Sequence, residues 1–119
     1  MSYSKRMTWT EKLEIGAGDM WWVYAAIGYP LTKSARSVDF INNTNVDIWI
    51  TTDPMIDMLK LAPYSYEMWD IGTHMSLHDK PLLIDVGTQF YARCSKIHMP
   101  NAGTWVSVHC LIPEINSGS

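Results

Sequence analysis

Apolar and polar residues alternate in short runs between residues 36 and 112, and this two-residue period constrains the fold more than any other feature of the chain. A period of two places every second side chain on the same face of a β-strand, so that one face of each run is buried. The clearest run is "TWVSVHCLIP", in which one face carries Val106, Val108, Cys110 and Ile112. The pattern predicts an all-β domain with about six or seven short strands.

The stretch "VDFINNTNVDIWITTDP" predicts a β-hairpin. Its asparagine-rich centre, residues 42–45, suits a tight connection because asparagine tolerates positive φ and bonds to its own backbone. Asp53-Pro54 ends the second strand, since proline lacks the N–H that a continuing ladder needs. The predicted inward residues are Val38 and Phe40 before the turn and Val46, Ile48 and Ile50 after it, and the predicted outward residues are Asp47, Trp49 and Thr51.

Turn signals separate the runs at fairly regular spacing, which is typical of an antiparallel β-sandwich of jelly-roll-like type. Residues 35–113 form this predicted domain. Residues 1–34 lack the alternation and contain the flexible break "GAGD", so they are predicted to form an extended N-terminal arm. Residues 114–119 are small and polar, and they are predicted to form a flexible tail.

Composition indicates that part of the apolar surface faces a partner. The 119 residues suffice for one domain, and 47% of them are hydrophobic while only 18% are charged. Interface cores are poor in charge and rich in tryptophan, tyrosine and methionine. In the run "WWVY" the two adjacent tryptophans point to opposite faces of a strand, which favours contact with a neighbouring subunit, although packing in the protein's own core remains an alternative. The predicted interface residues are Trp9, Trp21, Trp22, Tyr24, Trp49 and Trp69.

Charge and hydropathy argue against two classes of partner. The net charge is −3, with nine basic and twelve acidic residues spread along the chain, so no basic stripe is available for direct nucleic-acid binding. The longest apolar stretch, residues 20–31, is too short to span a bilayer and carries Gly28 and Pro30. We therefore expect neither a membrane span nor a signal peptide.

The two cysteines allow one bridge at most. Cys94 and Cys110 each share strand parity with apolar neighbours, so both thiols are predicted to lie in the core as small apolar side chains. A disulfide between the sheets is the alternative, and it would need an oxidising compartment.

Several residues have chemistry that could belong to a catalytic or metal site. His74 and His78 lie four apart near Asp70 and Asp79, but the segment does not read as helical and has no third ligand at a diagnostic distance. We expect a solvated loop there and no metal. The acidic pairs Glu67 with Asp70 and Asp79 with Asp85 are ordinary surface charges.

Ser107 and His109 lie on the same strand face, as a serine nucleophile and its base would. No nucleophile elbow surrounds Ser107 and the sequence offers no third orienting residue. The run "GAGDMWW" has no phosphate-binding lysine. The sequence therefore predicts a protein that is not an enzyme and needs no cofactor.

The order of four segments, "VDFINNTNVDIWITTDP", "LKLAPYSYEMWDIGT", "LLIDVGTQFYAR" and "GTWVSVHCLI", resembles small β-sandwich virion proteins of tailed bacteriophages. In that group a strand enters N-N/T-T, a second strand carries V-D-V/I-x-I-S/T-x-D, and G-T-Q-x-Y precedes a final V-x-V strand. The match covers residues 37–112 and does not include the first thirty or so.

The resemblance implies a ring, adaptor, fibre-attachment or decoration subunit of the virion. Such a subunit is assembled in the host cytoplasm and binds copies of itself and other virion proteins, so a homo-oligomer is expected. The alternative function is a carbohydrate- or ligand-binding β-module, in which Trp49, Trp69 or Tyr64 would stack on a sugar face.

Overall fold

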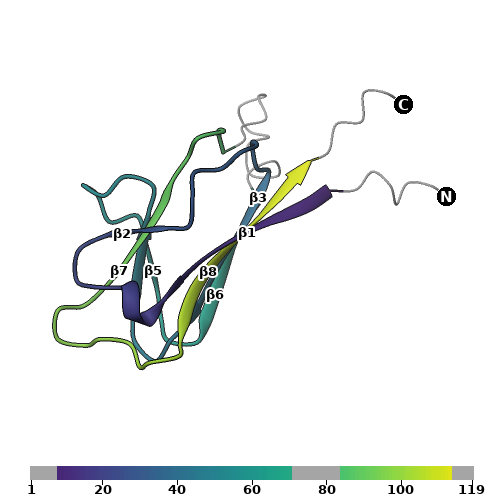
Figure 1. Cartoon of the computed structure of the whole chain (residues 1–119). Coiled ribbons are helices and arrows are strands. Elements are labelled where there is room, and N and C mark those ends of the chain that lie inside the picture. Colours follow the sequence, from purple (N-terminus) through teal and green to yellow (C-terminus); the bar gives the residue numbers. More distant parts are fainter. Residues whose placement is uncertain (1–7, 71–83, 114–119) are drawn as a thin grey trace, which may run out of the picture.

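The computed structural model describes residues 8–70 and 84–113, which form two antiparallel four-stranded sheets packed face to face (Figure 1). The first sheet has the order β1-β8-β3-β6, with bounds β1 Thr8–Gly16, β8 Trp105–Pro113, β3 Ser37–Asn43 and β6 Ser65–Asp70. The second sheet has the order β2-β7-β4-β5, with bounds β2 Ala25–Ile27, β7 Phe90–Cys94, β4 Ile48–Thr51 and β5 Leu59–Leu61. A single 3₁₀ turn, η2 (Ala17–Asp19), follows β1 among the described residues.

The strand pairing is nested. β1 pairs with β8, β2 with β7, β3 with β6 and β4 with β5, and the four pairs alternate between the two sheets. An antiparallel ladder of this kind, folded over into two packed sheets, is the eight-stranded jelly roll. The predicted all-β, jelly-roll-like sandwich is therefore confirmed.

The core lies between the sheets and is built from the predicted faces. Phe40 lies at its centre, with ring centroids 5.0 Å from Trp69 and 5.8 Å from Phe90 in edge-to-face geometry. Both cysteines are buried and free, as predicted, and no bridge joins the sheets. The inward faces of β3, β4, β7 and β8 carry Val38, Phe40, Ile48, Ile50, Phe90, Ala92, Cys94, Val106, Val108, Cys110 and Ile112.

Residues 8–34 do not form an arm, so the predicted boundary at residue 34 is wrong. β1 pairs with β8 along nine residues, and β2 extends the second sheet beside β7. Their buried apolar residues, together with those of the loops that flank β2, are Leu13, Ile15, Met20, Ile27 and Leu31. The alternation in β1 is hard to recognise because Glu11 occupies an inward position, where its carboxylate accepts a 3.2 Å hydrogen bond from the Thr32 hydroxyl. Residues 1–7 and the predicted tail, 114–119, lie outside the described part of the chain.

The predicted hairpin in the stretch 38–54 is also wrong. β3 belongs to the first sheet and β4 to the second, so residues 44–47 cross from one sheet to the other. The predicted faces are nevertheless right for the inward residues, since Val46, Ile48 and Ile50 are buried. Thr51 was predicted to face solvent, and it is buried, with its hydroxyl donating to the Asp53 carbonyl at 2.8 Å.

Asn42 holds this crossing together from a fully buried position. Its side-chain amide donates to the carbonyls of Val46 (2.9 Å), Leu61 (3.2 Å) and Ala62 (2.9 Å). Its Oδ1 accepts from the amide N–H (3.0 Å) and the hydroxyl (2.6 Å) of Thr44. Since Leu61 ends β5 and Ala62 begins the connection from β5 to β6, one side chain bonds both crossings between the sheets at this end of the sandwich.

Within residues 8–70 and 84–113, no helix is long and apolar enough to cross a membrane.

Candidate functional site

Four side chains form a row across the outer face of the second sheet. Arg93 of β7 lies directly opposite Trp49 of β4, which lies opposite Lys60 of β5. Tyr24 immediately precedes β2, whose register with β7 places it beside Arg93. We call Tyr24, Arg93, Trp49 and Lys60 the cation–aromatic row.

Each aromatic ring of the row has a cation over it. The Arg93 guanidinium carbon lies 4.4 Å from the Trp49 ring centroid and 5.4 Å from that of Tyr24. The Lys60 ammonium lies 5.4 Å from the Trp49 centroid. These distances are within the range of cation–π attraction, which is worth roughly 0.5–1 kcal/mol at exposed sites. Trp49 is therefore contacted by a cation from the strand on each side.

The charges of the row are paired locally. Asp57, in the loop between β4 and β5, accepts hydrogen bonds from Arg93 Nη2 at 3.0 Å and Nε at 3.4 Å, and the Tyr24 hydroxyl donates to the same carboxylate. Lys60 lies 3.8 Å from the carboxylate of Asp47. Two cations and two anions balance, so the face offers aromatic surface without a strong field of either sign.

The same contacts shift the pKa values of Asp57 and Tyr24 in opposite directions. Arg93, and then the Tyr24 hydroxyl, lower the pKa of Asp57 because both donate to its charged form. Burial raises the pKa of Tyr24 to about 12, and the bond to Asp57 adds to the effect. Tyr24 therefore stays a hydrogen-bond donor well above neutral pH, and Asp57 stays an acceptor.

We expect one tyrosine to ionise near pH 12 in an alkaline titration followed by absorbance at 295 nm. The Tyr24→Phe variant should lack that step, and Asp57→Asn should move it to lower pH because a charged acceptor is lost. Because the raised pKa belongs to the folded state, the stability that this bond provides is complete below the normal tyrosine pKa of about 10 and is lost as the pH rises toward 12. Tyr64→Phe, which removes an exposed tyrosine, is the matched control and should keep the late step.

The "WWVY" run begins at the edge of the same sheet. The Trp21 carbonyl accepts from the Cys94 amide at 2.8 Å and from its thiol at 3.2 Å, which fixes the backbone to β7. The side chains of Trp21 and Trp22 are nevertheless 54% and 50% exposed. Lys96 lies 5.0 Å from the Trp22 ring centroid, so a further cation–aromatic pair lies beside the row. The run thus exposes two large aromatic side chains next to a backbone carbonyl that is hydrogen-bonded to β7.

The structure brings four of the six predicted interface residues to the second sheet, namely Trp21, Trp22, Tyr24 and Trp49. Trp69 lies in β6 of the first sheet, packs on Phe40, and donates from Nε1 to Glu67 at 2.7 Å. Trp9 lies opposite Ile112 in the β1–β8 register.

The sequence pattern did not single out Arg93, Lys60 or Asp57. The alternation in β7 predicts that Arg93 points outward. The residues beside it could not be predicted, because they come from strands that are distant in the sequence.

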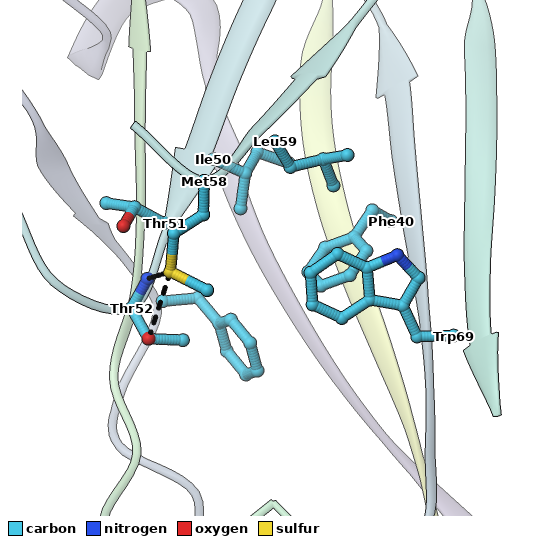
Figure 2. Close-up of a pocket in the computed structure, with 8 residues that line it drawn as sticks. Phe40, Ile50, Thr51, Thr52, Met58, Leu59 and Trp69 are labelled. Atoms are coloured by element: carbon cyan, nitrogen blue, oxygen red, sulfur yellow. Dashed lines mark hydrogen bonds between the residues drawn. The ribbon is translucent and has the colours of Figure 1, made fainter. Parts of the chain in front are cut away.

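An apolar pocket opens between the sheets near Trp69 (Figure 2). Figure 2 shows the rings of Phe40 and Trp69 together on one side and Met58 on the other, where its sulfur accepts from the Thr52 amide and hydroxyl at 3.4 Å each. The cavity volume is about 10 Å³, close to the minimum that one water molecule needs. Its lining residues are Phe40, Ile50, Thr51, Thr52, Met58, Leu59, Trp69 and Phe90.

The structure describes both members of the candidate nucleophile–base pair, Ser107 and His109. Ser107 is only 1% exposed, and no hydrogen bond joins it to His109. Asp39 lies opposite His109 in the β3–β8 register, where the orienting carboxylate of a catalytic triad could lie. Its buried Oδ1 nevertheless has no hydrogen-bond partner. Within residues 8–70 and 84–113, no three acidic, histidine or cysteine side chains are grouped as metal ligands would be. His74, His78 and Asp79 lie outside the described residues.

Comparison of the chain with models of protein families, with curated proteins and with solved structures found no match.

Proposed function

We propose that the protein is a structural subunit of a tailed bacteriophage virion that binds copies of itself and other virion proteins through the outer face of its second sheet. The resemblance of residues 37–112 to small virion proteins of these phages supports the virion as its location, with assembly in the host cytoplasm. Jelly rolls also serve in viral capsid and lectin domains, which is a fold-level analogy and carries less weight.

One observation carries the assembly function: Trp21 and Trp22 are half exposed while the Trp21 carbonyl is hydrogen-bonded to Cys94 of β7. Tryptophan, tyrosine and arginine dominate the energetics of protein interfaces when they fill pockets on a partner. A backbone that is already ordered also reduces the conformational entropy lost on binding. The adjoining row adds Tyr24, Trp49 and Arg93, with its charges already paired within the subunit.

A carbohydrate-binding module is the alternative function. A sugar would need a free aromatic face, and the Trp49 ring already has Arg93 at 4.4 Å and Lys60 at 5.4 Å. Trp69 packs against Phe40 in the core, which leaves Tyr64 as the exposed aromatic of the three that were considered for sugar stacking. This geometry favours a protein partner over a sugar.

Replacing Trp21 and Trp22 together by alanine should leave the domain folded, because neither ring belongs to the core. Association with the particle should weaken by about 2 kcal/mol or more if either ring is a central contact, which is about 30-fold in affinity. The double variant Tyr64→Ala and Val86→Ala, which also removes two exposed apolar side chains, is the control and should assemble normally.

Incorporation is measured by mass spectrometry of purified particles, with circular dichroism to check the fold. Absence of the unmodified chain from those particles would rule out the virion function. Binding on a glycan array that Tyr64→Ala abolishes would establish the alternative.

A further inference from the structure

β6 differs from the other edge strands of the sandwich. The edges of the second sheet, β2 and β5, are three residues long, and short edge strands resist pairing with other chains. The other edge of the first sheet, β1, exposes Lys12 and Glu14, and outward charges protect an edge in the same way. β6 is six residues long, contains no lysine or proline, and exposes Tyr66 (70%) and Met68 (57%).

The backbone of β6 is paired on one side only among the described residues, where β3 is its neighbour. Tyr66 and Met68 lie on the outer face of the sheet, opposite Ile41 and Asp39 of β3. An edge with this length and apolar character is a template for a further strand. A second copy of the chain supplies an identical edge, and two identical edges pair antiparallel about a two-fold axis.

Two pairing registers are possible in which five residues of each β6 lie opposite the second copy. The position of the Glu67 carboxylate makes one of them less stable than the other. An axis at Glu67 places that carboxylate directly opposite its own copy, which is destabilising. An axis at Met68 instead places Glu67 opposite Trp69 of the second copy, and the indole N–H of Trp69 already donates to Glu67 at 2.7 Å within one chain. Tyr66 then lies diagonal to Met68 of the second copy, within reach of a sulfur–aromatic contact.

We propose that two copies of the chain pair antiparallel through β6 with the two-fold axis at Met68, which joins their first sheets into one sheet of eight strands. This dimer is independent of the outer face of the second sheet and of the particle to which the chain belongs. It uses the one edge among the described strands that is six residues or longer, lacks lysine and proline, and exposes the large apolar side chains Tyr66 and Met68.

The test is a cysteine at the axis of the full-length chain. Residues that face each other across an antiparallel pair have Cα atoms about 4.5–5.5 Å apart, which a disulfide can bridge, so Met68→Cys should form a disulfide-linked dimer under mild oxidation. Tyr66→Cys should not, because its own copy lies about four residues, or roughly 13 Å, along the strand. Cys94 and Cys110 are buried and should not contribute.

A second variant tests the dimer without oxidation. Met68→Lys places two ammonium groups opposite each other and should raise the dimer dissociation constant about tenfold or more in sedimentation equilibrium. Met55→Lys, at an exposed loop position, and the double alanine variant of Trp21 and Trp22 should leave that constant unchanged.

The proposal is overturned if the unmodified chain is monomeric at its highest soluble concentration, or if Tyr66→Cys bridges as readily as Met68→Cys. Bridging only in a mixture of Tyr66→Cys and Met68→Cys chains would place the axis at Glu67 and would equally overturn the proposed register.

Discussion

Removal of residues 1–30 is expected to leave a chain that no longer unfolds cooperatively. The deletion removes β1 and β2, and with β1 a nine-residue pairing that forms one edge of the first sheet. It also removes Leu13, Ile15, Met20 and Ile27 from the core, and fully burying one such side chain contributes about 1.5–3 kcal/mol. These four side chains alone amount to about 6–12 kcal/mol, which is comparable to the roughly 5–15 kcal/mol by which a typical domain is stable, and the strand pairing is lost in addition. Thermal unfolding followed by circular dichroism and calorimetry should show no sharp transition.

A pair of single substitutions isolates the contribution of β1. Leu13→Asn buries an amide among apolar side chains and removes a core residue, so it should lower the free energy of unfolding by about 3 kcal/mol or more. Lys12→Asn places the same residue on the exposed face next to it and loses only the 3.9 Å contact with Glu14, so the change should stay within about 0.5 kcal/mol. A truncated chain that still melts sharply would show that residues 8–30 are dispensable, contrary to their pairing in both sheets.

Asn42→Asp is expected to lower the free energy of unfolding by about 3–5 kcal/mol, although the two side chains have nearly the same shape. The asparagine amide donates to three backbone carbonyls, and a carboxylate can donate to none of them. The substitution therefore leaves buried acceptors without donors and places a negative charge beside them. Both crossings between the sheets lose their bond at this end of the sandwich.

Asn43→Asp is the matched control, since the neighbouring side chain is partly exposed and a carboxylate there remains solvated. Its effect should be within about 0.5 kcal/mol. Both variants can be compared by urea denaturation at neutral pH, where the slope should match that of the parent chain. Equal midpoints for the two variants would show that the bonds of Asn42 contribute little to stability.

The faces of the strands could be predicted from the sequence because they depend only on local alternation. Val106, Val108, Cys110 and Ile112 were assigned to one buried face, and the structure buries all four. The same rule worked for Val46, Ile48 and Ile50, even though the partner assigned to their strand was wrong. Parity is a property of one strand, so it needs no knowledge of the rest of the chain.

Strand pairing could not be predicted in the same way. A turn that continues one sheet and a crossing to a second sheet both need asparagine, threonine and a change of direction, so residues 42–45 fit either structure. β1 was missed for another reason, because Glu11 interrupts its apolar face and the 3.2 Å bond from Thr32 that accommodates it comes from a distant residue. The cation–aromatic row likewise joins Tyr24, Arg93, Trp49 and Lys60 from four separate segments.

The nested pairing also fixes when the chain can fold during synthesis. Of the described strands, β1 is translated first and its partner β8 last, while β2 waits for β7, so the second sheet is complete only after β7, and the first only after β8, has left the ribosome. Pairing between residues this far apart in sequence makes folding slow, with rates typically on a scale of milliseconds to seconds. Until then the apolar face of β1, with Leu13 and Ile15, is exposed to other nascent chains. Expression yield should therefore respond more strongly to chaperone supply and growth temperature than the stability of the finished domain would suggest.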